Sequence, residues 1–313
     1  MMFSIKNCGL MLEPQLGMST EDVVRCAQYA ERAGYGSIFR SDHLLPTPGW
    51  GAEDDSPECW VTLGAIAAAT KSIGFGPMVS PIGFRNPALL AKMACTLHSY
   101  TGGRLLLGVG AGWFRGEYEA HGFEFPKFGV RIDQLEEALE IIRPLTQGRR
   151  VSFDGKYFRA NTDFLPKPAG KIHLILGGKN EKLLRLIAKY ADEWNLVGAS
   201  AKEATELKSL LDLERPGRRI KLSKMWPFII DDNQKNLESR LKLYMRAWRI
   251  SGSVESAVPK LRKRGILYGK VSEVVNQINE QRESGVENFY FNILDGRDKE
   301  MMDSLTHLLK EEF

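Results

Sequence analysis

Residues 172–197, IHLILGGKNEKLLRLIAKYADEWNLV, contain one complete unit of the predicted fold. Two short apolar runs, at 172–176 and 193–197, flank a segment at 179–190 whose apolar residues recur at helical spacing. Runs that are apolar almost throughout are typical of strands covered on both faces, and the recurring spacing is typical of a helix with one buried side. The stretch therefore predicts a strand, a helix and a second strand parallel to the first.

The same alternation extends in both directions along the chain. Eight strands, each followed by a helical segment, imply either a (β/α)8 barrel or a long doubly wound sheet. A doubly wound dinucleotide-binding sheet carries GxGxxG after its first strand, and residues 9–22 lack that motif. We therefore expect an α/β fold, a (β/α)8 TIM barrel that forms a single domain over residues 1–313. The remaining predicted strands are 5–11, 36–40, 73–79, 104–109, 224–230 and 287–294.

Helix start signals support this reading. Ser19 and Asp22 stand at capping-box spacing, and Asn86 followed by Pro87 is a good N-cap and first helical residue. A further helix is predicted from Arg131, where apolar residues again repeat at three and four. The later predicted helices are 179–190, 201–213, 271–284 and 298–311.

Two insertions, in the regions after strands 4 and 7, depart from a minimal barrel. Residues 148–170 contain VSFDGKYFRA, which predicts a small hairpin with its turn at Asp154–Gly155. Residues 231–268 are polar and helical in pattern and follow the seventh strand. Because segments after a barrel strand lie over the mouth of the active site, we expect 231–268 to act as a lid or wall.

The charged residues do not indicate a nucleic-acid partner. The sequence has 43 lysines and arginines against 39 aspartates and glutamates, a formal net charge of +4. Its basic residues occur in small scattered groups, whereas nucleic-acid-binding proteins concentrate them on one face or helix. We interpret these groups as solvated charges of loops and helix ends, with a local anion site as the alternative.

The four cysteines, at 8, 26, 59 and 95, are far apart and form no CxxC motif. Zinc sites and redox dithiols need closely spaced ligands, so we expect no metal site and four thiols in the core. The chain opens without a signal-peptide pattern and has no apolar run near the ~20 residues that cross a bilayer. We expect a cytoplasmic protein in a reducing compartment, without a membrane partner.

Asp42–His43 is the most informative dipeptide. It directly follows the second predicted strand and so falls at the C-terminal rim, where barrel enzymes place catalytic groups. Histidine titrates near neutrality and can exchange a proton while a hydride moves at a neighbouring atom. The alternative is a loop aspartate that caps the next turn beside an incidental histidine.

The third predicted strand ends in an irregular stretch, Gly76–Pro77–Met78–Val79–Ser80–Pro81. Glycine and proline at these positions indicate a bulge or an unusual peptide bond. The alternative is a strand that simply ends in a turn at Pro77.

Glycine-rich loops follow two further strands. In the rim loop that runs from Gly108 to Glu117, Gly110 and Gly112 let a planar ring or a ribityl chain approach the backbone. After the fifth strand, Gly177–Gly178–Lys179 is expected to begin a helix, whose backbone N–H groups and lysine charge can hold a phosphate. Plain tight turns are the alternative for both loops.

Together these stretches resemble the bacterial-luciferase-like superfamily, and in particular its branch of coenzyme F420-dependent oxidoreductases. The matching segments follow one another in order over most of the chain, and the set is far more specific than any one motif. The segments are SDHL (41–44), FRNPALLAK (84–92), GGR (102–104), GVGAGW (108–113), RIDQLEEAL (131–139), LGG (176–178) and ADEWN (191–195).

The resemblance implies a cofactor ring that lies over the C-terminal strand ends. Asp42 and His43 would lie beside the ring and carry cofactor-binding and catalytic roles. A strained, often cis, peptide bond is implied at Met78–Val79 or Val79–Ser80, against the ring. Gly177–Gly178 would help to hold the cofactor phosphate.

One difference concerns the substrate. Sugar-phosphate dehydrogenases of this family have an acidic residue directly after the glycine loop of strand four, and this chain has Trp113 there. Oxidation of a sugar phosphate is therefore disfavoured. Trp113, Phe114 and Trp50 instead favour an apolar or aromatic small-molecule substrate.

The resemblance implies an F420-dependent oxidoreductase that moves a hydride between the deazaflavin and a small organic substrate. An alternative is a monooxygenase of the bacterial-luciferase type that uses reduced FMN, and the third reading is a flavin-binding protein without catalysis. Barrel enzymes of this kind often pair, so we expect a homodimer.

Overall fold

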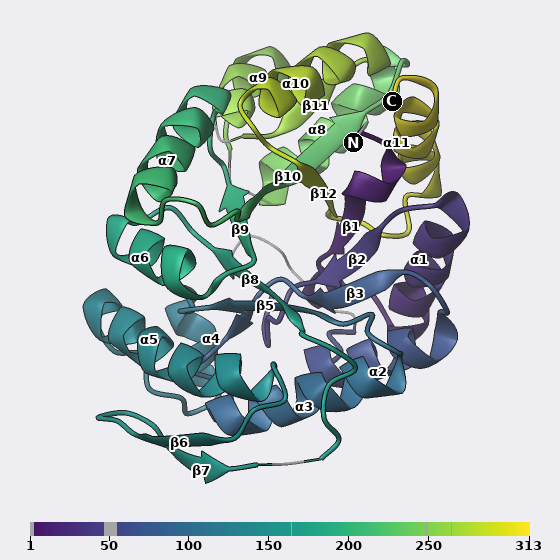
Figure 1. The fold of residues 1–313 in the computed structure, drawn as a ribbon. Coiled ribbons are helices and arrows are strands. Elements are labelled where there is room, and N and C mark those ends of the chain that lie inside the picture. Colours follow the sequence, from purple (N-terminus) through teal and green to yellow (C-terminus); the bar gives the residue numbers. More distant parts are fainter. Residues whose placement is uncertain (1–2, 47–54, 164, 248–249, 264) are drawn as a thin grey trace.

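The computed structural model describes residues 3–46, 55–163, 165–247, 250–263 and 265–313. Its main sheet is formed by β1 (Cys8–Leu12), β2 (Ser37–Arg40), β3 (Gly74–Pro77), β4 (Ser80–Pro81), β5 (Leu106–Gly110), β8 (His173–Gly177), β9 (Glu193–Val197), β10 (Lys221–Ile230), β11 (Leu267–Gly269) and β12 (Asn288–Ile293). The strands are parallel and follow the order β3-β2-β1-β12-β10-β9-β8-β5-β4, with β11 beside β10. Because β4 continues the chain from β3 and pairs with β5, the sheet closes into the predicted barrel (Figure 1).

Helices surround the barrel on its outside (Figure 1). The predicted caps are confirmed, since Ser19 Oγ accepts from Asp22 N–H (3.1 Å) and Asn86 Oδ1 accepts from Ala88 N–H (2.9 Å). No helix built by the described residues has the length and apolar character that a membrane crossing needs. The helices are α1 (Thr20–Ala33), α2 (Cys59–Ala69), α3 (Pro87–Tyr100), α4 (Arg115–Ala120), α5 (Phe128–Leu145), α6 (Glu181–Tyr190), α7 (Ala201–Glu214), α8 (Gln234–Ala247), α9 (Val254–Lys263), α10 (Val271–Glu283) and α11 (Lys299–Glu311).

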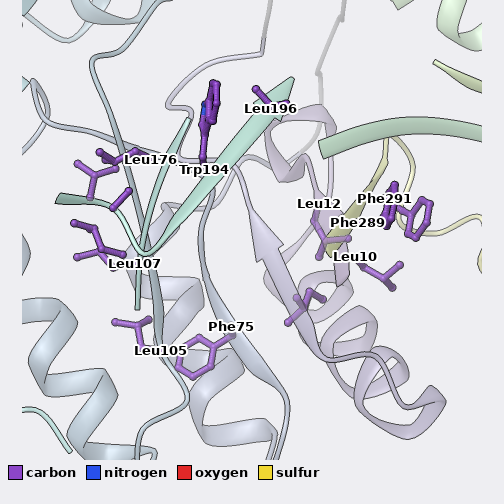
Figure 2. Close-up of a cluster of buried hydrophobic side chains, with 14 of the residues drawn as sticks. Leu10, Leu12, Phe75, Leu105, Leu107, Leu176, Trp194, Leu196, Phe289 and Phe291 are labelled. Carbon is purple, nitrogen blue, oxygen red and sulfur yellow. The ribbon is translucent and has the colours of Figure 1, made fainter. Parts of the chain in front are cut away.

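The apolar core lies on both sides of the sheet. Between the strands and the helices, a large cluster includes Leu10 and Leu12 of β1 (Figure 2). Met11, the residue between them, belongs instead to a small cluster inside the barrel. Both faces of each strand are therefore buried, which is why the strands are apolar runs rather than alternating ones. The inner cluster consists of Met11, Phe39, Met78, Ile175 and Tyr290.

The ends of several predicted strands differ from expectation, for example that of β10, which begins at Lys221 rather than at residue 224. The first strand begins at Cys8 rather than at residue 5, because residues 5–7 form a 3-10 turn. The third, expected as 73–79, is interrupted after Pro77 and resumes as β4 at Ser80. Between them the Met78–Val79 peptide bond is cis, at the first of the two implied positions.

The hairpin is formed by β6 (Val151–Asp154) and β7 (Arg159–Thr162). Its predicted turn at Asp154–Gly155 is wrong by one residue, because Asp154 still pairs with Arg159 and the connection covers residues 155–158. The Glu137 carboxylate accepts the backbone N–H groups of residues 156–158 and so fixes this loop against α5.

The insertion at 231–268 is helical for most of its length, as α8 and α9. Its last residues were expected to be helical as well, but Leu267–Gly269 pairs with Phe228–Ile230 as strand β11. The insertion has its own apolar cluster, which includes Leu237 and Leu261, and this explains why its helices are stable beside the barrel.

Gly76→Ala is expected to destabilise the fold. A Cβ at this position would lie 1.8 Å from the backbone oxygen of Leu106 on the neighbouring strand, so the two strands would have to separate. Overpacking of this kind costs about 1–3 kcal/mol. Gly129→Ala is the matched control, because nothing lies within 4 Å of the added Cβ and alanine favours helix α5.

Urea denaturation of both variants and the wild type measures this difference. We expect a lower free energy of unfolding for Gly76→Ala and an unchanged or higher one for Gly129→Ala. Equal values for the two variants would contradict the close approach of β3 and β5.

Candidate active site

A cavity of about 510 Å³ opens at the C-terminal ends of the barrel strands. This volume lies within the range of about 300–1,000 Å³ that is typical of small-molecule sites. It is lined by residues of the loops after β1, β2, β5 and β8 and by Met225 of β10. The predicted site residues that line it are Asp42, His43, Met78, Val79, Gly110, Gly112, Gly177, Gly178 and Lys179.

Other predicted residues occupy different positions. Ser80 lies beneath the cavity and donates its hydroxyl to Asp42. Trp113 lines the cavity, whereas Phe114 stacks on the outer side of Trp113 with 5.5 Å between ring centroids. Trp50 lies outside the described residues. The described part of 231–268, expected as a lid or wall, contributes no lining residue.

Asp42 is buried and held by a fixed set of donors. Ser80 Oγ donates to Oδ2 at 2.6 Å, and Arg85 donates to both carboxylate oxygens at 2.6 and 3.1 Å. Arg85 also reaches Glu58. Two charged nitrogens on one carboxylate form a bidentate pair, which fixes its orientation. Asp42 is thus held by Ser80 of β4 and by Arg85, which precedes α3, and not by the imidazole of His43.

His43 is instead paired with Glu117, a residue of α4. Its Nδ1 lies 3.0 and 3.1 Å from the two carboxylate oxygens, and Oε2 also accepts the Leu44 backbone N–H at 3.0 Å. Glu117 is almost fully buried, so this carboxylate is shielded from water. With Nδ1 engaged, Nε2 is the ring nitrogen left to exchange a proton.

The environment raises the pKa of His43 above its ordinary value near 6.5. Burial, the largest single influence, lowers the pKa because it disfavours the imidazolium. The Glu117 hydrogen bond and the negative charges of Glu13, Glu117 and Asp42 together outweigh burial. The imidazole therefore keeps its proton to a higher pH than an exposed histidine.

Sequence reasoning missed two acidic residues of this site. Glu117 was noted only as part of a rim loop, and Glu13, which directly follows β1, was not singled out. Glu13 lines the cavity and accepts from Asn292 Nδ2 (2.7 Å) and Gln15 Nε2 (2.6 Å). Glu13 had a positional signal, since it directly follows β1, whereas Glu117 lies within α4 and had no such signal.

Side chains at Gly110 and Gly178, two glycines of the site, would collide with neighbouring residues. A Cβ on Gly110 would lie 2.6 Å from Val79 Cγ2, and one on Gly178 would lie 2.5 Å from Leu183 Cδ2. Gly178 also has φ +118°, which L side chains rarely adopt. The cavity wall here is therefore formed by bare backbone.

Lys179 was expected to begin a helix, and this is wrong. Helix α6 starts at Glu181, because the Asn180 side chain accepts the Lys182 N–H and caps it. Lys179 stands in the loop before that cap, where its Nζ lies 3.4 Å from Glu203. Its charge is consequently close to the glycines and at the edge of the cavity.

A family model described as luciferase-like monooxygenase matches residues 2–307. An F420-dependent glucose-6-phosphate dehydrogenase of Nakamurella multipartita is 32% identical over 197 residues, which cover 61% of this chain and 57% of that protein. An F420-dependent hydroxymycolic acid dehydrogenase of Mycobacterium tuberculosis is 34% identical over 194 residues, covering 61% and 52%. The matched segments thus span little more than half the length of these relatives.

Among solved structures, the fold is similar to that of an F420-dependent secondary alcohol dehydrogenase in complex with an F420–acetone adduct. The TM-score is 0.80 with 22% sequence identity, and the alignment covers 98% of each chain. At this identity the likeness concerns the fold, and it confirms the barrel.

Glu117→Gln is expected to lower the pKa of His43. The substitution removes a negative acceptor that stabilises the imidazolium, so the ring loses its proton at a lower pH. At a pH between the pKa of His43 in the variant and that in the wild type, the imidazole is mostly charged in the wild type and mostly neutral in the variant. An NMR titration of the histidine ring signals measures the change, with His43→Asn to assign the signal.

Glu119→Gln is the control, because Glu119 is on the same helix but is exposed and pairs with Arg115. It should leave the His43 titration unchanged. An unchanged His43 pKa in Glu117→Gln would show that the pair does not govern this proton.

Proposed function

The chain belongs to the luciferase-like monooxygenase family, and we propose that it is an F420-dependent oxidoreductase that transfers a hydride between the deazaflavin and a small organic substrate. The observation that carries this proposal is the cavity itself, where a wall of bare backbone faces a buried His43–Glu117 pair. The names of its F420-dependent relatives support the same cofactor.

The residues present fit a long, partly planar and anionic cofactor. Met78, Val79, Gly110 and Gly112 line the strand-end cavity and would contact the ring, the two glycines through bare backbone. Gly177–Lys179 would hold the phosphate through backbone N–H groups and one lysine charge. When bound, the deazaflavin supplies the hydride chemistry, and the protein supplies position and electrostatics.

The chain's own acid–base work falls to His43. Its Nε2 would give or take the proton of the substrate oxygen, while Glu117 holds the ring through Nδ1 and stabilises its charged form. Asp42 would contact the cofactor from a position fixed by Arg85. Because the pKa of His43 is raised, donation from the imidazolium stays available above its ordinary value.

The cavity favours an uncharged apolar or aromatic substrate. Trp113, which is 63% exposed, and the half-buried Phe128 line it, and Ile132 and Leu183 extend the apolar lining. Among the described lining residues, Lys179 is the one with a permanent positive charge, and it already pairs with Glu203. A sugar phosphate would need cationic partners that this lining does not offer.

A reduced-FMN monooxygenase is the second candidate function. The apolar lining that suits a hydrophobic substrate would also keep water from a reactive flavin. The family description, luciferase-like monooxygenase, favours this chemistry as well.

Parallel binding titrations with F420 and FMN separate the two candidates. We expect binding of F420 at micromolar concentrations and much weaker binding of FMN. His43→Ala should retain F420 binding but lose ~10²–10⁴ in turnover, because it removes the proton-transfer group and not the cradle. Turnover is followed as the change in F420 absorbance with a panel of apolar and aromatic alcohols.

His307→Ala, a change at an exposed position of α11, is the control and should behave as the wild type. Preference for FMN, with oxygen consumption, would replace the proposal by the monooxygenase. Full turnover in His43→Ala would overturn only the proposed acid–base role of His43, and the proposal of an F420-dependent oxidoreductase would stand.

The protein would work as a homodimer that pairs through α2 and α3. Helix α2 is apolar on all sides, a composition typical of a fully buried helix, yet its Val61 is 72% exposed. On the neighbouring α3, Leu89 and Tyr100 are also exposed, Tyr100 at 68%. Exposed apolar side chains on two neighbouring helices are the reason for placing the interface here.

Val61→Asp combined with Leu89→Asp is expected to abolish pairing, because two buried unpaired carboxylates oppose association. Light scattering after gel filtration should give twice 35.2 kDa for the wild type and 35.2 kDa for the variant. Leu213→Asp, an exposed position on α7, is the control and should remain paired. A wild-type monomer would disprove the proposal.

A further inference from the structure

A second cavity, of about 780 Å³, lies outside the barrel wall. It is bounded by α7, α10 and the segment before β11, and by the outer face of β10. Along β10, Met225 lines the strand-end cavity, whereas its neighbours Lys224 and Trp226 line this outer one. Lys179 lines both cavities, so the two are adjacent. Their other lining residues are different.

Lys224 is a buried amine in the wall of this side cavity, only 1% exposed. Its Nζ donates to the Ala199 backbone oxygen at 2.7 Å and lies 4.0 Å from the centre of the Trp226 ring. Within the described part of the chain, no carboxylate forms an ion pair with it. Burial removes the water that would solvate a charged ammonium, and the hydrogen bond to Ala199 replaces only part of that solvation.

The charged groups around Lys224 come from every neighbouring element. They are Glu203 of α7, Glu273 and Glu280 of α10, Arg262 of α9 and Lys179. Burial lowers the pKa of Lys224 to about 7, against the opposing charges of Glu280 and Glu203. Near neutral pH much of this amine is therefore uncharged and has a free electron pair.

Two residues that line the side cavity each carry a buried polar atom that has no hydrogen-bond partner among the described residues. The atoms are Trp226 Nε1, a donor, and Gln281 Oε1, an acceptor, and both side chains are at least nine-tenths buried. A buried unpaired group carries its full desolvation cost, so such atoms indicate a missing partner. A ligand that carries an oxygen could satisfy both.

We propose that the side cavity binds small aldehydes or ketones and that Lys224 forms a reversible imine with them. The neutral Nζ attacks the carbonyl carbon, a C–N bond forms, and the carbonyl oxygen takes up one amine proton to become a hydroxyl. Loss of that hydroxyl with the second amine proton, as water, gives the imine. The step involves no oxidation, and hydrolysis reverses it.

The two unpartnered atoms match the oxygen of this reaction. Trp226 Nε1–H donates to the carbonyl oxygen while the C–N bond forms, and Gln281 Oε1 accepts the hydroxyl proton of the adduct. Trp226 also keeps its ring beneath the amine. The site does not rest on the proposed hydride transfer, since Lys224, Trp226 and Gln281 do not line the strand-end cavity.

Reductive trapping tests the proposal on the intact protein. Propanal with sodium cyanoborohydride converts an imine into a stable secondary amine, which peptide mass spectrometry locates and quantifies. At pH 7 we expect Lys224 to be modified at least tenfold faster than Lys202, whose side chain is 86% exposed. An ordinary lysine with pKa near 10.4 is almost entirely protonated at this pH.

The rate ratio of Lys224 to Lys202 should fall toward one as the pH rises from 7 to 10, because the exposed amine then also becomes neutral. Modification of Lys224 no faster than Lys202 at pH 7 would overturn the proposal. So would a Lys224 rate that appears only after unfolding in urea.

Trp226→Phe separates a formed binding site from a merely reactive amine. It keeps an aromatic ring near Lys224 but removes the N–H donor. The propanal concentration that gives half the maximal Lys224 rate should increase several-fold, with the Lys202 rate unchanged. Rates for Lys224 that never saturate with propanal in the wild type would show that no binding site exists.

Discussion

The close approach of β3 and β5 is the constraint on which the barrel and its site depend. A side chain on Gly76 would collide with the Leu106 backbone, and one on Gly108 would lie 2.3 Å from the Pro77 oxygen. Bare backbone at these points lets β3, the first strand of the sheet order, approach β5, the strand that pairs with the last one, β4. The same contact brings Val79 against Gly110 and so forms one wall of the strand-end cavity.

The electrostatics of the site follow from two pairings, Asp42 with Arg85 and Glu117 with His43. Asp42 adjoins His43 in sequence, yet it is satisfied by Arg85 and Ser80 and stays fixed whatever the state of the imidazole. Glu117, from a different element, is therefore the acid whose interaction with His43 depends on the proton. Glu117 thus holds the titrating ring directly, whereas Asp42 acts on it through charge alone.

The sequence predicted what depends on local pattern and strand order. Apolar runs identified the barrel strands, and the position of Asp42–His43 after a strand correctly placed the pair at the C-terminal rim, where it lines the cavity. The pattern could not distinguish Glu117 from Glu119, because only the packing of α4 buries one and exposes the other. Nor could it reveal β11, since Leu267–Gly269 is too short to stand out and is a strand only through its pairing with β10.

Lys179 borders both cavities, so the phosphate-binding role proposed for it would link them thermodynamically. A phosphate that draws Lys179 away from Glu203 would leave that carboxylate unpaired, and its negative charge raises the pKa of Lys224. Occupancy of one cavity would then make the amine in the other more basic and less nucleophilic. Coupling between binding sites is reciprocal, so a carbonyl compound bound to Lys224 would in turn weaken the binding of the phosphate. Lys179 would in this way produce negative cooperativity between two unlike ligands.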